Sequence, residues 1–538
     1  MEATGTGFEA QVMHCEQKED IILSASDIAV ITVLCILVSL GITATIVDVF
    51  SELTSDSERN SKDKSVLTQC LLCFSFYTNT KRLLKKDDSK DSIKIFHGMK
   101  VITVLWVILN HSYYYTNIQV AGSLITVTDW RQKIAFQLMA NGFLNVETFF
   151  FITAVLIAYG VTRMPGKQIN IGLYIVRRIW RLTPPFMLVI ATSFLVPYFG
   201  SGPVWHETVV EGIINKCKKN WWKNLLYFNN FVPVKETCFP WMWYLPADTH
   251  LYIIALVFLI PLKRNVNLAF LMNGVLLAAG TCATIFNNYY YQLHPTAITA
   301  FTHPEDGNYF ADYGYFRSYL HLSTYCVGMT VGYVIATRKK IHIPLVVNIL
   351  GWLVSSVAAL TVLYGVYEWN QGNVPSLVVS TLYTCTNKFV WSLALGWVTV
   401  VCMTGNGGIV TRILSWQAFV PLSRLTYMAY LVHPIIQFMY VGSTRVLIRA
   451  DHRTFVFMYL GYVLTGFMSA FVLSLLFESP FMALEKVFLA PKKKTDEKEL
   501  PKSVESTQKP WKAINLNHKS RVYSVSGSQN AAMENGVH

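Results

Sequence analysis

The chain has 538 residues, of which 53% are hydrophobic and only 14% are charged. Because a soluble domain carries about a quarter charged residues, this composition excludes an ordinary soluble globular protein. The formal net charge is +13 at pH 7. A nucleic-acid partner would need a soluble basic domain to bind it. The sequence contains none, so we predict no nucleic-acid partner.

Long apolar runs recur along the whole chain and predict an all-α, multi-pass membrane protein. A helix needs about 20 apolar residues to cross a bilayer, and by this measure we predict about eleven spanning helices. The count depends most on the two runs that carry polar residues, 134–160 and 377–403. In chain order, the predicted spans are 28–50, 98–117, 134–160, 183–199, 244–262, 267–287, 318–337, 343–366, 377–403, 415–440 and 455–477.

Lysine and arginine predict the orientation, because they concentrate in cytosolic loops. With the N-terminus outside, most basic clusters fall in the cytosol, and only the loop 442–453 departs from the rule. We expect a plasma membrane or endoplasmic reticulum protein that contacts membrane lipids, with a polar tail too poor in apolar residues to fold. The predicted parts are an outer N-terminus (1–27), a first spanning helix (28–50), a cytosolic loop (51–96), a transmembrane domain (97–490) and a disordered cytosolic tail (491–538).

Two of the ten cysteines, Cys217 and Cys238, share one predicted outer loop. Oxidation is favoured on that side of a membrane. We therefore predict a disulfide between them, with two free thiols as the alternative.

Nine ionisable residues fall inside predicted spans, where each costs several kcal/mol and so asks for a reason. For every one of them the alternative to a functional role is a pair between helices or a side chain that reaches the interface. For Glu147 we favour such a pair, with Arg424 or Lys388 as the partner. The nine are Lys100, His111, Glu147, Asp248, His250, His321, Lys388, Arg424 and His433.

Three of these residues are predicted to lie at one depth. Lys100 is near the inner end of its span, and His111 lies eleven residues further, roughly 16 Å at the rise of an α-helix. Counted from the predicted ends of their own spans, Asp248 and His433 also fall in the outer half. Two imidazoles and one carboxylate at one level predict an acid–base site.

An arginine pair stands at the opposite, cytosolic side. Arg178 and Arg181 are three residues apart, so they share a helix face. Paired guanidinium groups suit phosphate. The alternative is an anchor that only sets the orientation of the helix.

Six segments, taken in order, resemble the motifs of the acyltransferase-3 family of membrane acyltransferases. They resemble most closely its animal branch, the nose resistant to fluoxetine family, over residues 70–490. Lys100, Ala154 and Asp248 stand where the family more often has Arg, Gly and Glu. The segments are Phe74–Leu84, Lys100 with His111 after ten residues, Phe149–Ala154, Arg178 with Arg181, Trp243–Asp248, and Ser423–Pro434.

The resemblance implies transfer of an acyl group, often acetyl, from cytosolic acyl-coenzyme A to a hydroxyl acceptor on the outer or lumenal side, without a metal. Arg178, Arg181 and Lys100 would hold the donor. His111 would be the general base, and Asp248 would orient it, stabilise its charge or bind the acceptor. His433 and Glu147 would line the substrate tunnel.

The resemblance also supports a second function. Animal members of the family have been linked to uptake of lipids and hydrophobic drugs. A non-catalytic transporter of lipids or hydrophobic compounds with the same fold is therefore the alternative to the enzyme. Retention of His111 together with the arginine pair favours catalysis, because a lipid carrier needs no site for coenzyme phosphates.

Overall fold

The computed structural model describes residues 22–54, 65–86, 93–116, 120–122, 129–130, 133–166, 168–296, 304–338 and 341–489. Most of the predicted outer N-terminus and the whole predicted tail lie outside these ranges. The described residues form helices and turns, and their one β-type pairing is an isolated bridge between Ala121 and Ile448. The predicted all-α class is therefore confirmed.

Eight helical stretches of the described residues are long and apolar enough to cross a membrane. The protein is thus a polytopic membrane protein, although helix length and composition do not establish eleven spans. The eight are Ala25–Thr54 (α1), Ile95–Tyr114 (α4), Gly142–Arg163 (η4 and α7), Pro240–Leu262 (η9, α10 and α11), Val266–Tyr290 (α12), Leu345–Asn370 (α16 and α17), Leu377–Met403 (α18) and His452–Leu489 (α21, η12 and α22).

The three other predicted spans also lie on helices. These are α8 (Ile171–Ser193), α15 (Leu322–Thr337) and α20 (Phe419–Gly442). Helix α8 begins well before the predicted start of its span at 183, so the arginines predicted at the cytosolic side, outside the span, belong to the same helix. Their charges had hidden its first turns from an apolar-run search. Helix α15 has 16 residues and is preceded by the 3-10 turn Ser318–His321 (η11).

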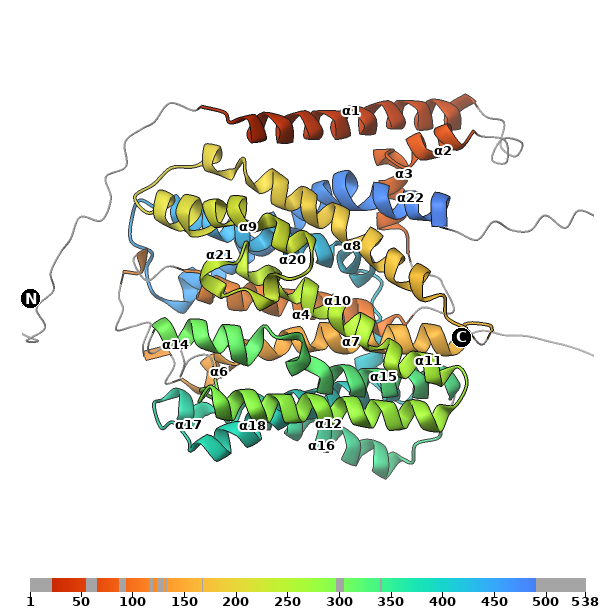
Figure 1. Cartoon of the computed structure of the whole chain (residues 1–538), viewed down its shortest axis with the longest axis vertical. Helices are drawn as coiled ribbons and strands as arrows, with labels where there is room; N and C mark the ends of the chain where they lie inside the picture. Colours follow the sequence, from red (N-terminus) through yellow and green to blue (C-terminus); the bar gives the residue numbers. More distant parts are fainter. Residues whose placement is uncertain are drawn as a thin grey trace, which may run out of the picture. The chain divides into compact units, whose positions relative to one another are not determined.

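Helices α7 (Asn145–Arg163) and α15 lie side by side at very close range (Figure 1). A Cβ atom built on Gly328 would come within 2.7 Å of the Ala154 Cβ, and one built on Gly332 within 2.5 Å of the Val155 carbonyl oxygen. This is the small-residue spacing that lets two membrane helices approach. Ala154 thus lies at the contact between these helices.

Helices α4 and α20 run side by side in the same direction. Near their starts a hydrogen bond joins His97 Nδ1 and Ser423 Oγ, 2.5 Å apart. Near their ends the Gln437 amide donates to the Ile108 carbonyl oxygen at 3.3 Å. Residues at matching positions along these two helices therefore lie at matching depths.

Helix α1 lies along one edge of the helices in Figure 1 and buries only Asp27, Gly41 and Ala44. Polar contacts attach its two ends. At the first end, the Tyr198 hydroxyl donates to Asp27 at 2.6 Å. At the other end, Ser75 donates to Asp48 at 2.6 Å, which ties α1 to α3 (Phe76–Leu84).

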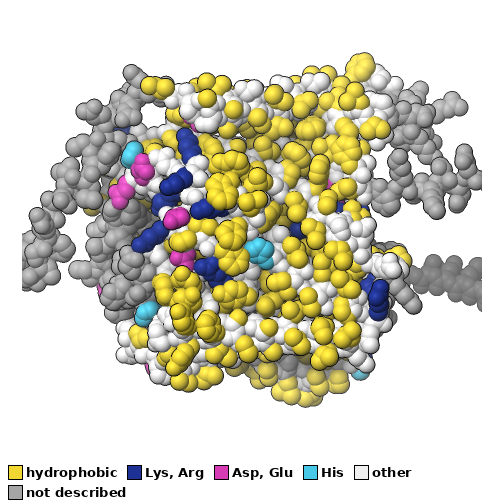
Figure 2. All heavy atoms as spheres, in the orientation of Figure 1, with side chains coloured by type: hydrophobic (Ala, Val, Ile, Leu, Met, Phe, Trp, Pro, Cys, Tyr) yellow, Lys and Arg dark blue, Asp and Glu magenta, His cyan; other side chains and the backbone are white. Residues whose placement is uncertain are grey.

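The described surface fits a lipid environment. Figure 2 shows a face covered mainly by hydrophobic side chains, with most of the visible lysines and arginines on the left half of the view. Of the 20 residues of α16 (Leu345–Tyr364), only Ser355, Val362 and Leu363 are buried. The remaining apolar side chains of this helix face outward, as expected where lipid replaces water.

Candidate active site

A cavity of about 840 Å³ lies among α4, α7, α8, α10 (Tyr244–Ile254) and α20. This volume is in the upper part of the range of about 300–1,000 Å³ found for small-molecule and cofactor sites. We call the end of the cavity where α4 and α8 begin the arginine end, and the end where α4 finishes the histidine end. The polar residues that carry the argument and line the cavity are Lys100, His111, Arg177, Arg178, Arg181, Asp248, Glu478 and Glu485.

The arginine end is built mainly by α8. The Asn170 side chain caps this helix by accepting the backbone N–H of Leu173 at 2.9 Å. The following turns bring Arg178 and Arg181 to one face, as the spacing predicts, and both line the cavity. Lys100 of α4 lies close enough for their positive charges to act on it. Three predicted donor-binding residues therefore meet in one place.

Asp248 lines the cavity but faces Arg178 rather than His111. The two side chains form an ion pair, and the Asp248 side chain is 1% exposed. The guanidinium of Arg178 also lies 5.0 Å from the ring centre of Tyr252. Among the described residues Asp248 pairs with Arg178 and forms no hydrogen bond with His111 or His433, and its role in binding the acceptor stays a prediction.

The position of Asp248 along its span explains why it faces Arg178. The predicted depth is counted from a span that begins at residue 244. In the structure the 3-10 turn Pro240–Trp243 (η9) precedes α10 and extends the span by four residues. Counted from Pro240, Asp248 therefore lies roughly 8 Å further along the span than predicted, at the 3-10 rise of about 2.0 Å per residue.

Two further carboxylates at the arginine end were missed from the sequence. Glu485 of α22 (Ser479–Leu489) lies 3.9 Å from Arg177. Glu478 is 6% exposed, accepts a hydrogen bond from Ser474 and lies within reach of the charge of Arg181. Both belong to the last described helices, outside every motif segment. The only sequence signal for these two residues is the apolar run around them, which predicts that they belong to the membrane domain.

At the histidine end, His111 and His433 contact each other directly. His111 Nδ1 and His433 Nε2 are 2.8 Å apart, and His433 Nδ1 lies 2.8 Å from the Ala429 carbonyl oxygen. The His111 ring lines the cavity and packs 4.7 Å from Tyr115. His433 has no exposed surface and is not among the lining residues, so it lies behind His111 instead of in the tunnel wall.

Comparison with known proteins identifies the family that carries this site. A family model described as an acyltransferase domain, that of the acyltransferase-3 family, matches residues 93–479. The chain belongs to the acyltransferase-3 family. The match contains α4, α7, α8, α10 and α20, which are the helices that surround the cavity.

Two curated relatives of this acyltransferase-3 chain come from Caenorhabditis elegans. "Nose resistant to fluoxetine protein 6" is 29% identical over 493 residues, which cover 85% of this chain and 59% of that protein. "Regulator of hypoxia-inducible factor 1" is 23% identical over 400 residues, or 67% of this chain and 73% of that protein. No solved structure matches the chain.

Glu147, which we placed in the substrate tunnel, belongs to a separate buried cluster of the acyltransferase-3 domain. It contacts His321 Nδ1 at 2.6 Å, accepts from the Thr324 hydroxyl at 2.6 Å and lies 3.7 Å from Lys388. None of these four residues lines the cavity. The predicted pair with Lys388 is confirmed, whereas Arg424 donates to carbonyl oxygens at the end of α3.

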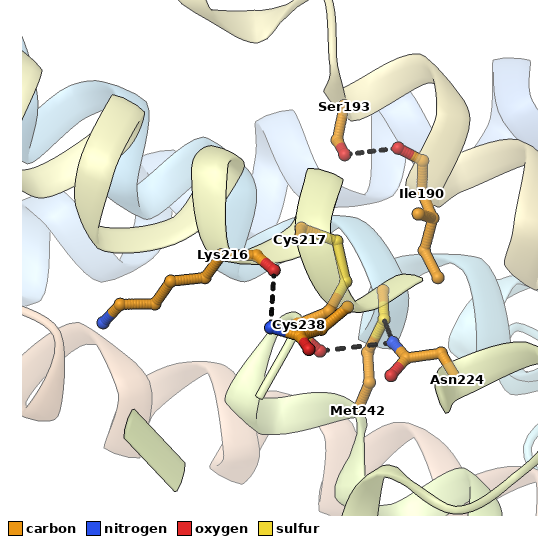
Figure 3. The surroundings of a disulfide bond; sticks show 8 residues. Ile190, Ser193, Lys216, Cys217, Asn224, Cys238 and Met242 are labelled. Atoms are coloured by element: carbon orange, nitrogen blue, oxygen red, sulfur yellow. Dashed lines mark hydrogen bonds between the residues drawn. A yellow bond between two sulfur atoms is a disulfide. The ribbon is translucent and has the colours of Figure 1, made fainter. Parts of the chain in front are cut away.

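A disulfide joins Cys217 and Cys238 (Figure 3). It connects α9 (Lys216–Leu225) to the segment that leads into η9 and α10, and the Asn224 amide donates to the Cys238 carbonyl oxygen at 3.2 Å. Phe239, directly after Cys238, has a left-handed φ of 54° and is fully buried. The disulfide thus holds the start of the helix that carries Asp248.

Proposed function

We propose that the chain is a membrane acyltransferase that moves an acyl group, acetyl above all, from acyl-coenzyme A to a hydroxyl acceptor. The donor would enter at the arginine end, which we place on the cytosolic side of the plasma membrane or endoplasmic reticulum. The acceptor, a hydroxylated molecule or lipid, would enter at the histidine end. One observation carries this proposal: a single cavity is lined by both the arginines and His111.

The charges of the arginine end support binding of a phosphate-rich donor. Lys100, Arg177, Arg178 and Arg181 all line the cavity. Three carboxylates, those of Asp248, Glu478 and Glu485, also line it. Asp248 forms an ion pair with Arg178, and Glu485 forms one with Arg177. Phosphate oxygens form strong charge-assisted hydrogen bonds with guanidinium groups, so coenzyme phosphates would replace these carboxylates as partners of the arginines.

The length of the donor fits the spacing along α4. Lys100 and His111 are separated by roughly 16 Å at the helical rise. The pantetheine arm of coenzyme A is roughly 15–20 Å long when extended, on standard covalent geometry. With the phosphates at Arg178 and Arg181, the thioester would reach the level of His111.

In the proposed reaction His111 accepts the proton of the acceptor hydroxyl while the hydroxyl oxygen attacks the thioester carbonyl carbon. The tetrahedral intermediate then collapses, the carbon–sulfur bond breaks and coenzyme A leaves as a thiolate. The His111 imidazolium returns the proton to the sulfur, so the base is regenerated. Histidine suits both steps because its ordinary pKa lies near working pH.

A transporter is the second candidate, and the cavity itself favours it. The lining includes Arg181 at the arginine end. It also includes Lys216, the first residue of α9. A passage lined by residues of both ends suits a carrier of lipids or hydrophobic compounds as well as an enzyme.

Calorimetric titration with acetyl-coenzyme A separates the two functions. An acyltransferase binds this donor at or below tens of micromolar. The same titration with the 3′-dephosphorylated coenzyme tests whether the phosphate groups contribute, as the arginine end requires. Absence of binding at these concentrations would overturn the enzyme proposal and leave transport as the better account.

A further inference from the structure

The rings of His111 and His433 have an unusual mutual geometry. Their planes differ by only 12° and their centres are 5.0 Å apart. Combined with the 2.8 Å contact between His111 Nδ1 and His433 Nε2, this places the rings edge to edge and nearly coplanar. The N–H of one ring therefore points along the lone pair of the other, which is the favourable direction for a hydrogen bond.

The protons of the pair follow from the partners of its nitrogens. The Ala429 carbonyl oxygen can only accept, so His433 Nδ1, 2.8 Å away, must carry a hydrogen. Among the described residues no carboxylate hydrogen-bonds to either ring, and His433 is fully buried, so a charged His433 would be costly. A neutral His433 then has its lone pair on Nε2, and His111 Nδ1 must donate to it.

We infer that His433 is a positioning residue that fixes the tautomer of His111, with the hydrogen on Nδ1 and the lone pair on Nε2. The Nε2 lone pair points away from His433, on the ring that lines the cavity. The carbonyl of Ala429 sets the tautomer of His433, which in turn sets that of His111. This inference rests on the proposed function only where it assigns Nε2 as the basic atom.

A purely mechanical role for His433 makes a different prediction, because a second polar side chain joins the same helices. Gln437, one turn further along α20, donates to the Ile108 carbonyl oxygen and to Ser112 Oγ, both at 3.3 Å. It is 1% exposed, and among the described residues no hydrogen bond joins it to His111. Gln437→Leu removes a tie between α4 and α20 and leaves the His111 tautomer unchanged, so it is the matched control.

The tautomer is measured directly by nitrogen NMR of histidine-labelled full-length protein in detergent micelles, with His111→Gln used for assignment. We expect His111 Nε2 to give the resonance of an unprotonated nitrogen and Nδ1 that of a protonated one. His433→Leu should mix the two tautomers, whereas Gln437→Leu should not. Protonated Nε2 in the unchanged protein would overturn the inference, whether or not the protein transfers acyl groups.

Kinetics give the second readout. If the protein transfers acyl groups, His433→Leu should lower kcat by about 10²–10⁴-fold, because loss of the partner that sets a catalytic tautomer has an effect of this size. Affinity for acetyl-coenzyme A should not change. His433→Gln can still accept through its Oε1 and should retain more activity than His433→Leu. Equal kcat values for His433→Leu and Gln437→Leu would show that His433 has only a mechanical role.

Discussion

His111 is the residue on which the proposed chemistry depends. It is the only histidine among the residues that line the described cavity, and its partner His433 is buried behind it. We expect His111→Ala to abolish acyl transfer, with a loss of at least 10²-fold as is usual for a general base, while binding of acetyl-coenzyme A persists. His452→Ala is the control, because His452 stacks on Trp130 outside the cavity. Transfer that survives in His111→Ala would assign the base to another group.

The arginines of α8 give a prediction about affinity. Arg181→Gln should weaken binding of acetyl-coenzyme A by about 1.5–3 kcal/mol, the magnitude of a hydrogen bond to a charged group. Titration calorimetry measures this change. Arg163→Gln is the control, because Arg163 lies at the end of α7, contacts Tyr159 and does not line the cavity. Equal affinities for the two variants would leave Arg181 with a role in orientation alone.

Arg178 must be changed together with its partner. Arg178→Gln alone would leave the Asp248 carboxylate buried without its counter-ion, which costs about 3–5 kcal/mol of folding free energy. The double variant Arg178→Gln/Asp248→Asn removes both charges. We expect it to remain folded in thermal unfolding assays and to bind acetyl-coenzyme A more weakly than Arg181→Gln does, because Arg178 is the less exposed of the two arginines. Unchanged affinity in the folded double variant would exclude Arg178 from donor binding.

Individual residues also mark the limit of sequence-based prediction. The spacing of Arg178 and Arg181 was enough to place both on one face, because the helical repeat is fixed. The partner of Asp248 was not predictable, since it depended on a 3-10 turn that extends the span. The partners of Glu147 depended on the packing of α7 against α15 and α18, which no local pattern encodes.

Among the helices, α7 and α15 approach each other closely at two glycines of α15, Gly328 and Gly332. Gly332→Ala would press a methyl group against the Val155 carbonyl oxygen and the Ala158 Cβ. Overpacking of this kind costs about 1–3 kcal/mol, so we expect a lower unfolding temperature and lower activity, because α7 also forms a wall of the cavity. Gly160→Ala is the control, since a Cβ there meets nothing within 4 Å. Similar unfolding temperatures for the two variants would contradict the close-packed contact.

The disulfide between Cys217 and Cys238 is a second feature that stabilises the arrangement of the helices. A crosslink that closes a loop of this size stabilises a protein by about 3 kcal/mol, and the loop between Cys217 and Cys238 spans 21 residues. We expect Cys217→Ser/Cys238→Ser to unfold at lower temperature and to bind the donor less well, because the loop leads into η9 and α10. Cys282→Ser changes an exposed free cysteine and should have neither effect. A double variant with the thermal stability of Cys282→Ser would show that the disulfide does not support this segment.

The helices themselves were the most predictable level. Apolar runs located all eleven predicted segments on helices, because a bilayer imposes helical hydrogen bonding on any chain that crosses it. Apolar runs failed at the start of α8, where arginines precede the apolar stretch, and they missed the 3-10 turn η9 that precedes α10. The arginines of α8 build the arginine end of the cavity, so functional residues account for the failure at α8.

At the scale of the whole molecule, the proposed reaction uses the membrane to separate two substrates. The cavity would admit a phosphate-rich donor at the arginine end and an acceptor at the histidine end. The match to the acyltransferase-3 family covers the helices that surround this cavity. Helices α1, α2 (Val66–Leu72) and α3 lie outside the matched residues, and hydrogen bonds from Tyr198 to Asp27 and from Arg424 to carbonyl oxygens of α3 attach α1 and α3 to the domain.

The most direct test of this account is a structure of the protein with a non-hydrolysable acetyl-coenzyme A analogue. We predict that the phosphate groups contact Arg178 and Arg181, and that the acetyl group lies beside His111 with Nε2 facing it. An analogue bound outside the cavity, or with its acetyl group at the arginine end and away from His111, would contradict the central claim that one cavity joins the donor site to the base.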